Sequence, residues 1–133
     1  MSFARSLVAG SVLAALALAT GCAGIGDRDV VFRDTQRRYT QYMRFTDFDK
    51  AGRYVIAEDR RDFRARTTAL GNMRFSDYEV QEVETDGDTA TARVSYTGFR
   101  ASSPIVVTFV EDQAWQLVGS NWQVRSTMEE VTQ

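Results

Sequence analysis

Two patterns of apolar and polar residues divide the chain near residue 72. Before this point, apolar side chains recur every three to four residues, which is typical of amphipathic helices. After it, β-branched and aromatic residues alternate with polar ones, which is typical of half-buried strands. The sequence therefore predicts an α+β domain, with two to three N-terminal helices packed on a bent four-stranded antiparallel sheet.

The first helix is predicted over residues 27–45. Its buried stripe combines aromatic, aliphatic and threonine side chains at helical spacing: Val31, Phe32, Thr35, Tyr39, Tyr42 and Met43. Thr46 is expected to cap a second, short helix that carries acidic residues in its first turn. A third helix is predicted over residues 58–70, with Phe63 and Thr67 facing inward and Gly71 as a left-handed stop.

Strands are predicted over residues 75–84, 89–99 and 105–118, and from residue 122 onward, after a turn over residues 119–121. Asp86-Gly87 indicates a tight hairpin between the first two strands. The third strand is expected to bend near residues 111–113, and Glu111, Asp112 and Gln113 are interpreted as a solvated bulge. Trp115 and Trp122 flank the last turn, where they either pair across it or leave one ring exposed as a contact surface.

The first 22 residues resemble a bacterial export signal. Arg5 precedes an apolar run over residues 7–19, and the small residues Thr20 and Gly21 lead to Cys22. The segment Ala19-Thr20-Gly21-Cys22 resembles a lipobox, the sequence at which bacterial lipoproteins are cleaved and acylated on cysteine. Two glycines indicate a tether over residues 22–26, and the length that follows suits one domain over residues 27–133. The lipobox resemblance implies a signal peptide over residues 1–21 and lipidation at Cys22. It also implies attachment to the periplasmic face of the outer membrane.

A second interpretation of the leader remains open. Ala17-Leu18-Ala19 also fits ordinary secretory cleavage, which would release a soluble periplasmic protein. Lipidation explains the single cysteine, whereas a catalytic thiol would need a nearby base and the chain has no histidine. Without histidine or a second cysteine, we expect no metal site and no cofactor.

Charge is uneven along the 133 residues, whose net charge is −2. Residues 27–74 contain 12 basic and eight acidic side chains, and residues 75–133 contain three basic and 10 acidic ones. Because the basic residues are interleaved with acids, no concentrated patch for nucleic acid is expected. Contact with anionic lipid is an alternative for the arginines of the third helix, Arg60, Arg61, Arg64 and Arg66.

The order of elements is similar to the nuclear transport factor 2-like fold, a cone-shaped α+β module. The resemblance covers residues 27–127 and is carried by the aromatic first helix, the segment Thr46-Asp47-Phe48-Asp49 and the long final hairpin from Trp115 through Trp122. It implies an interior pocket lined by Phe32, Tyr39, Tyr42, Phe63 and Trp115. Enzymes of this group place a carboxylate and a tyrosine inside the cone, so a pairing of Tyr39 or Tyr42 with Glu111 or Asp112 is an alternative to core tyrosines and a solvated bulge.

The expected function is that of a membrane-anchored, non-enzymatic binding or assembly module of the bacterial envelope. Its expected partners are the membrane, through the lipid anchor, and an envelope protein or a second copy bound through the sheet. One alternative is a small isomerase or hydrolase that uses a buried carboxylate and a tyrosine. Another is a purely structural lipoprotein. Fold alone does not decide between them.

Overall fold

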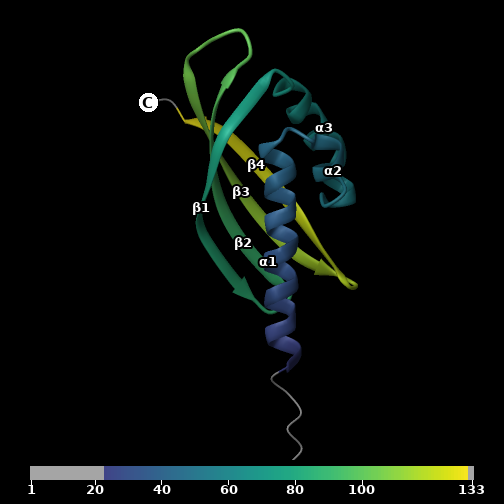
Figure 1. Ribbon diagram of the computed structural model, residues 1–133. Coiled ribbons are helices and arrows are strands. Elements are labelled where there is room, and N and C mark those ends of the chain that lie inside the picture. Colours follow the sequence, from purple (N-terminus) through teal and green to yellow (C-terminus); the bar gives the residue numbers. More distant parts are fainter. Residues whose placement is uncertain (1–22, 132–133) are drawn as a thin grey trace, which may run out of the picture.

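Helices precede strands in the computed structural model, which describes residues 23–131 (Figure 1). The helical part contains α1 (Ala23–Arg44), α2 (Phe48–Gly52), the short 3₁₀ helix η1 (Ala57–Asp59) and α3 (Arg60–Ala69). The strands are β1 (Met73–Asp86), β2 (Thr89–Arg100), β3 (Val106–Val118) and β4 (Asn121–Val131). They form one antiparallel sheet in the order β1-β2-β3-β4, which confirms the predicted α+β class. The predicted signal peptide and Cys22 lie outside the described residues.

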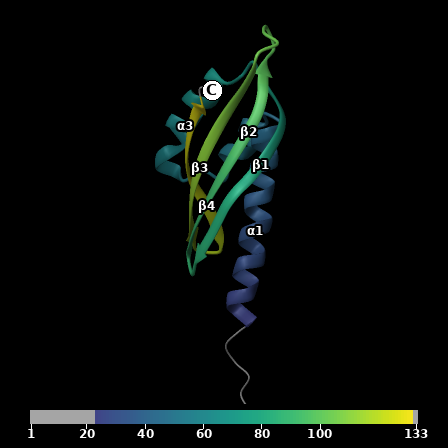
Figure 2. The same ribbon diagram turned by 90° about the vertical axis from the view of Figure 1, so that its left-hand side faces the viewer.

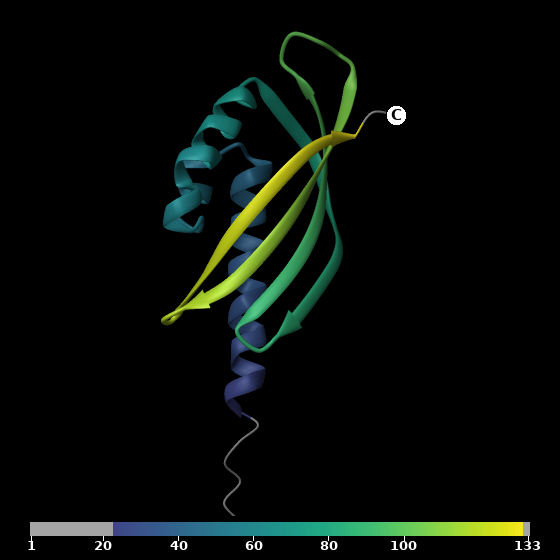
Figure 3. The ribbon, with the colours of Figure 1, turned by 180° about the vertical axis from the view of Figure 1, so that it is seen from behind.

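The sheet is strongly curved, and the helices lie on its inner side. Figure 2 looks onto the outer face, and Figure 3 shows α1 running along the opposite face with α2 and α3 beside it. Two register shifts in β1, between Phe75 and Asp77 and between Val80 and Glu82, are the local cause of bending in that strand. An extra residue in one strand of an antiparallel pair bends the strand and increases its twist.

The buried stripe of α1 is rotated relative to the prediction. Phe32, Tyr39 and Met43 are buried as expected, but Val31 is 51% exposed. Gln36 and Thr40 take the inward positions between the apolar residues, and both are buried. The sequence interpretation was wrong here because it gave the inner face to apolar side chains and overlooked the polar residues with hydrogen-bond partners inside.

Three helix boundaries differ from the prediction. Residues 23–26, expected to form a tether, belong to α1, which at 22 residues is about 33 Å long. Asp47, not Thr46, caps α2 by accepting a hydrogen bond from the Lys50 amide, while Thr46 has a positive φ of 55°. The helix stop at Gly71 is not left-handed, because among the described residues only Gly87 and Gly119 are glycines with positive φ. Gly87 lies in the predicted β1–β2 hairpin.

An aromatic cluster fills the space between α1 and the sheet. The Phe32 ring packs against Trp115 at 5.8 Å and against Trp122 at 5.1 Å between centroids. Tyr39 contacts Trp115 edge-on at 5.4 Å. Trp115 and Trp122 are 2% and 4% exposed, so neither tryptophan provides the exposed contact surface considered from the sequence.

A short extended segment holds the small helices against the edge of the sheet. The Val124 amide donates to the Tyr54 carbonyl at 2.8 Å, and the Ile56 amide donates to the Val124 carbonyl at 3.1 Å. This parallel bridge covers part of the β4 edge and leads directly into η1 and α3. It therefore fixes the position of α3 relative to both α2 and the sheet.

Candidate functional site

A buried polar cluster lies in the core between α1 and the inner face of the sheet. Its centre is the Glu111 side chain on β3, which has no exposed surface. Tyr39 comes from α1, Tyr96 from β2 and Ser126 from β4, and each is less than 10% exposed. Because inward positions alternate along a strand, β3 places Phe109, Glu111, Gln113 and Trp115 on the same face.

The Glu111 carboxyl group accepts four hydrogen bonds. Tyr39 Oη and Ser126 Oγ donate to Oε2, at 2.7 and 2.5 Å. Tyr96 Oη and Gln113 Nε2 donate to Oε1, at 2.9 and 2.6 Å. A carboxylate offers about four lone-pair sites, so the four donors occupy its full accepting capacity.

A second set of contacts fixes the orientation of Gln113. Its Oε1 accepts from Trp115 Nε1 at 3.0 Å and from Gln36 Nε2 at 3.3 Å. Its Nε2 also approaches Thr40 Oγ1 at 3.4 Å, and Gln36 Nε2 donates to that same hydroxyl at 3.0 Å. Every buried side-chain nitrogen and oxygen among residues 23–131 has a hydrogen-bond partner. The cluster is therefore internally satisfied.

The two tyrosines of the cluster are held in their neutral form. Burial raises the pKa of Tyr39 well above its ordinary value, and the negative charge of Glu111 raises it further. Burial and then Glu111 likewise raise the pKa of Tyr96 well above its ordinary value. Both hydroxyls therefore remain hydrogen-bond donors across the physiological pH range.

The location of Glu111 and Gln113 overturns the interpretation of residues 111–113 as a solvated bulge. β3 pairs with β2 and β4 without a register shift over this stretch, and both side chains are buried. Only Asp112 faces outward, where Arg93 Nε donates to it at 2.7 Å. That hydrogen bond, with the arginine charge, lowers the pKa of Asp112. The unbroken alternation with Phe109 and Trp115 was the signal that could have placed Glu111 inside.

The residues expected to line a pocket fall into three environments. Phe32, Tyr39 and Trp115 pack against one another in the core. Tyr42 is half-buried beside Tyr54, with 6.2 Å between ring centroids. Phe63, on α3, is buried at the margin of the same core and also lines an open groove. The structure brings Tyr39 together with Glu111, and it does not place Tyr42 or Asp112 in that cluster.

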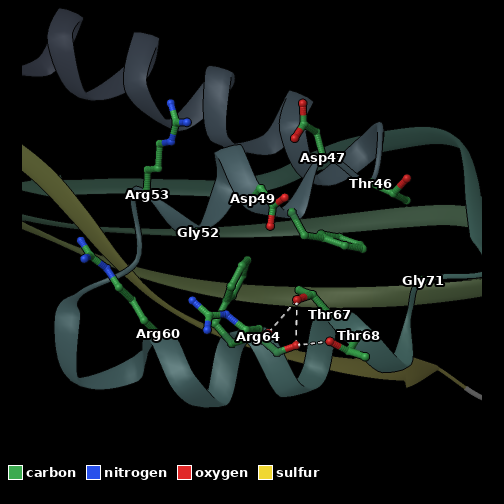
Figure 4. Close-up of a pocket in the computed structure, with 12 residues that line it drawn as sticks. Thr46, Asp47, Asp49, Gly52, Arg53, Arg60, Arg64, Thr67, Thr68 and Gly71 are labelled. Atoms are coloured by element: carbon green, nitrogen blue, oxygen red, sulfur yellow. Dashed lines mark hydrogen bonds between the residues drawn. The ribbon is translucent and has the colours of Figure 1, made fainter.

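The open groove lies between α2 and α3 and has a volume of about 640 Å³ (Figure 4). Phe48 from α2 and Phe63 from α3 form its apolar part. Gly52 lies directly beside the Phe63 ring, since a Cβ atom there would be 3.5 Å from Cε1. Charged side chains line the groove on both sides: Asp47, Asp49, Arg53, Arg60 and Arg64. Sequence analysis placed acidic residues in the first turn of the second helix and offered Arg60 and Arg64 as a contact for anionic lipid, but it did not predict a groove.

Two further features of residues 23–131 concern metal ions and membranes. Within this range, no group of three or more carboxylate, histidine or cysteine side chains is arranged to hold a metal ion. No helix in the same range has the length and apolar character needed to cross a membrane.

The arrangement of helices and sheet defines a nuclear transport factor 2-like fold, and comparison with solved structures agrees. The chain is similar to a ketosteroid isomerase-like protein from Erwinia carotovora atroseptica, with a TM-score of 0.63 and 15% identity over 78% of this chain and 96% of that one. It is also similar to a nuclear transport factor 2-like protein from Cytophaga hutchinsonii, with a TM-score of 0.56 and 16% identity over 78% and 98% of the two chains.

A third similar structure is a SEC-C motif containing protein from Rhodopseudomonas palustris, with a TM-score of 0.54 and 16% identity over 76% of each chain. No protein-family model matches the sequence. No curated protein matches it either. At these identities the similarity establishes the fold alone.

Proposed function

We propose that this chain is a lipid-anchored, non-enzymatic binding module of a bacterial envelope. The non-enzymatic part of the proposal rests on the hydrogen bonds of Glu111. All four of its hydrogen-bond acceptor sites are used by donors of the same chain, and it has no exposed surface. A general base must reach the proton that it removes, directly or through one water. Glu111 has neither access nor a free lone pair for that task.

The same network supports a structural role for the interior. Phe32 packs against Trp115 and Trp122 between α1 and the sheet, and all three rings are buried. Binding would then take place on the surface, where the groove between α2 and α3 offers both charged and apolar side chains. Ligand sites are concave, and a volume of about 300–1,000 Å³ is usual, a range that includes this groove.

The lipid anchor is proposed from the sequence before residue 23. Cys22 follows an apolar run and a lipobox-like segment, and two or more acyl chains give stable membrane attachment. In cells expressing the full chain, Cys22→Ala should move the protein from the membrane fraction to the soluble periplasmic fraction. Membrane association retained by this variant would contradict lipidation at Cys22.

A second candidate function is favoured by one observation. Tyr39 and Tyr96 both donate to a buried carboxyl group, which is the combination of residues expected of a small isomerase or hydrolase. For this candidate, a motion that opens the core would have to expose Glu111.

Complementation of a deletion strain separates the two candidates. Glu111→Gln keeps the shape of the side chain and removes its charge, so it abolishes a carboxylate base. A binding module predicts that this variant restores the deletion phenotype when its level by immunoblot equals that of the wild type. An enzyme predicts loss of complementation at equal protein level. Asp112→Asn, one residue away on the outer face, is the matched control and should complement in both cases.

A further inference from the structure

The groove between α2 and α3 is lined by charges of both signs, with Arg53 at the C-terminal end of α2 and further arginines along α3. Asp49 lies on α2, and Arg60 and Arg64 lie one turn apart on α3. Figure 4 shows Asp49 and Arg64 extending toward the space between the helices. Asp47, the other acid of the groove, is already engaged by Lys50 at 3.2 Å and by the cap of α2. Asp49 therefore supplies the available negative charge.

These three charged side chains have no ionic partner within the described part of the chain. The ion pairs found among residues 23–131 involve other groups and do not include Asp49, Arg60 or Arg64. Asp49 and Arg64 also do not pair with each other across the groove. Their charges are consequently available to groups on a ligand.

Arg60 is held in place by the fold. Its Nε donates to the Val55 carbonyl at 3.0 Å, on the segment that bridges to β4. This bond leaves the two terminal nitrogens as donors. An arginine fork with its outer edge free matches the geometry of a carboxylate.

Aromatic side chains lie between the charged groups of the groove. Phe48 is half-buried on α2, and Phe63 is 3% exposed beneath the groove. A purely anionic ligand would meet repulsion from Asp49, and a purely cationic one would meet repulsion from the arginines. A molecule with an ammonium group, a carboxylate group and an apolar portion can contact the acid, the arginines and the aromatic rings at the same time.

We propose that this groove binds a short zwitterionic peptide, with its ammonium group at Asp49, its carboxylate at Arg60 and Arg64, and its apolar side chain against Phe48. The inference rests on the proposed function as a binding module and names the class of its ligand. Charge-assisted hydrogen bonds are among the stronger polar contacts, so each terminus of the peptide should contribute measurably to affinity.

The test uses the dipeptide alanylphenylalanine in three forms: free, N-acetylated and C-amidated. Each form is titrated into the isotope-labelled protein while amide chemical shifts are followed. The free dipeptide should shift signals from residues 46–71 in a saturable manner. Blocking either terminus should weaken binding by about tenfold, which is the effect of losing a hydrogen bond to a charged group.

Two variants assign each terminus to its side chain. In Arg64→Gln, the preference for the free over the amidated dipeptide should shrink, while the preference over the acetylated one persists. In Asp49→Asn, the preference for the free over the acetylated dipeptide should shrink, while the preference over the amidated one persists, because each variant removes only one of the two contacts. Arg93→Gln and Asp112→Asn remove equivalent charges from the outer sheet face and should leave all three affinities unchanged.

Failure of the ligand assignment is distinguishable from failure of the proposed function. Absence of saturable shifts at residues 46–71, or blocked dipeptides that bind as well as the free one, would overturn the zwitterion proposal. The same holds if Asp49→Asn and Arg64→Gln, with unchanged thermal unfolding, alter no preference. The binding-module proposal is decided separately, by complementation with Glu111→Gln.

Discussion

Removing the acceptor at the centre of the buried cluster should have a large effect on stability. Glu111→Ala leaves Tyr39, Tyr96, Gln113 and Ser126 without the group to which they donate. Each buried donor without an acceptor costs about 1–3 kcal/mol. Gln113 Nε2 keeps Thr40 Oγ1 as an acceptor, so three hydroxyl donors are left unpaired. Even at the lower end, these three lower the free energy of unfolding by about 3 kcal/mol. That is a substantial part of the stability of a domain, which is typically about 5–15 kcal/mol.

Glu111→Gln should be much milder, because the amide can preserve most of the contacts. Gln113 Nε2 cannot accept a hydrogen bond, so the new amide oxygen must stay where Oε1 lies. The new amide nitrogen then faces Tyr39 and Ser126, whose hydroxyl groups can rotate to accept from it. The remaining loss is that of a charged acceptor, about 1–2 kcal/mol.

Urea unfolding followed by tryptophan fluorescence measures both changes, since Trp115 and Trp122 are buried in the native state. Asp112→Asn is the control: it alters the neighbouring residue on the exposed side of β3 and should leave the midpoint nearly unchanged. The reasoning is refuted if Glu111→Ala unfolds at the same urea concentration as Asp112→Asn. It is also refuted if Glu111→Gln is as damaging as Glu111→Ala.

Two further predictions concern alkaline pH and the glycines of the sheet. The pKa values of Tyr39 and Tyr96 are raised in the native state. The two tyrosines therefore contribute fully to the free energy of unfolding below about pH 10. Above it, the unfolded chain binds fewer protons than the native one. As the pH rises further, each tyrosine should lower the free energy of unfolding by about 1.4 kcal/mol per pH unit. Urea unfolding at a series of pH values measures this effect, and midpoints that stay constant up to about pH 11 would contradict it. Gly98→Ala should disrupt β1–β2 pairing, because its Cβ would lie 2.2 Å from the Arg74 carbonyl oxygen. Gly87 has φ +59° and open space around it, so Gly87→Ala should lower the free energy of unfolding by only about 1–2 kcal/mol. Thermal unfolding followed by circular dichroism should therefore show a larger loss of stability for Gly98→Ala than for Gly87→Ala.

The types of the elements were predictable from the sequence because they depend on local periodicity. In β2, Ala90, Ala92, Val94 and Tyr96 alternate with polar residues along the sequence, and all four are buried. The Asp86-Gly87 turn was identified for the same reason, since a tight hairpin needs a residue that tolerates positive φ. These features require no knowledge of distant contacts.

The buried cluster could not be predicted in full because its partners come from four separate elements. Tyr39 and Glu111 are 72 residues apart, and Gln36 and Gln113 are 77 apart. Taken singly, a glutamate or glutamine is most often exposed, so composition argued for a solvated bulge. Only the three-dimensional register shows that each polar group meets a partner. The groove was missed for a related reason, because α2 and α3 meet only through tertiary packing.

The buried cluster also has a consequence for the register of β3. A slip by one residue would turn Phe109, Glu111 and Trp115 outward and bring Asp112 inside, because successive side chains face opposite sides of a strand. The hydroxyl groups of Tyr39 and Tyr96 would then lack their acceptor, and the charge of Asp112 would be buried without Arg93. An apolar residue at position 111 would penalise such a slip less, since apolar contacts are not directional. The hydrogen bonds of Glu111 to α1, β2 and β4 therefore favour the observed pairing of β3 over a shifted one.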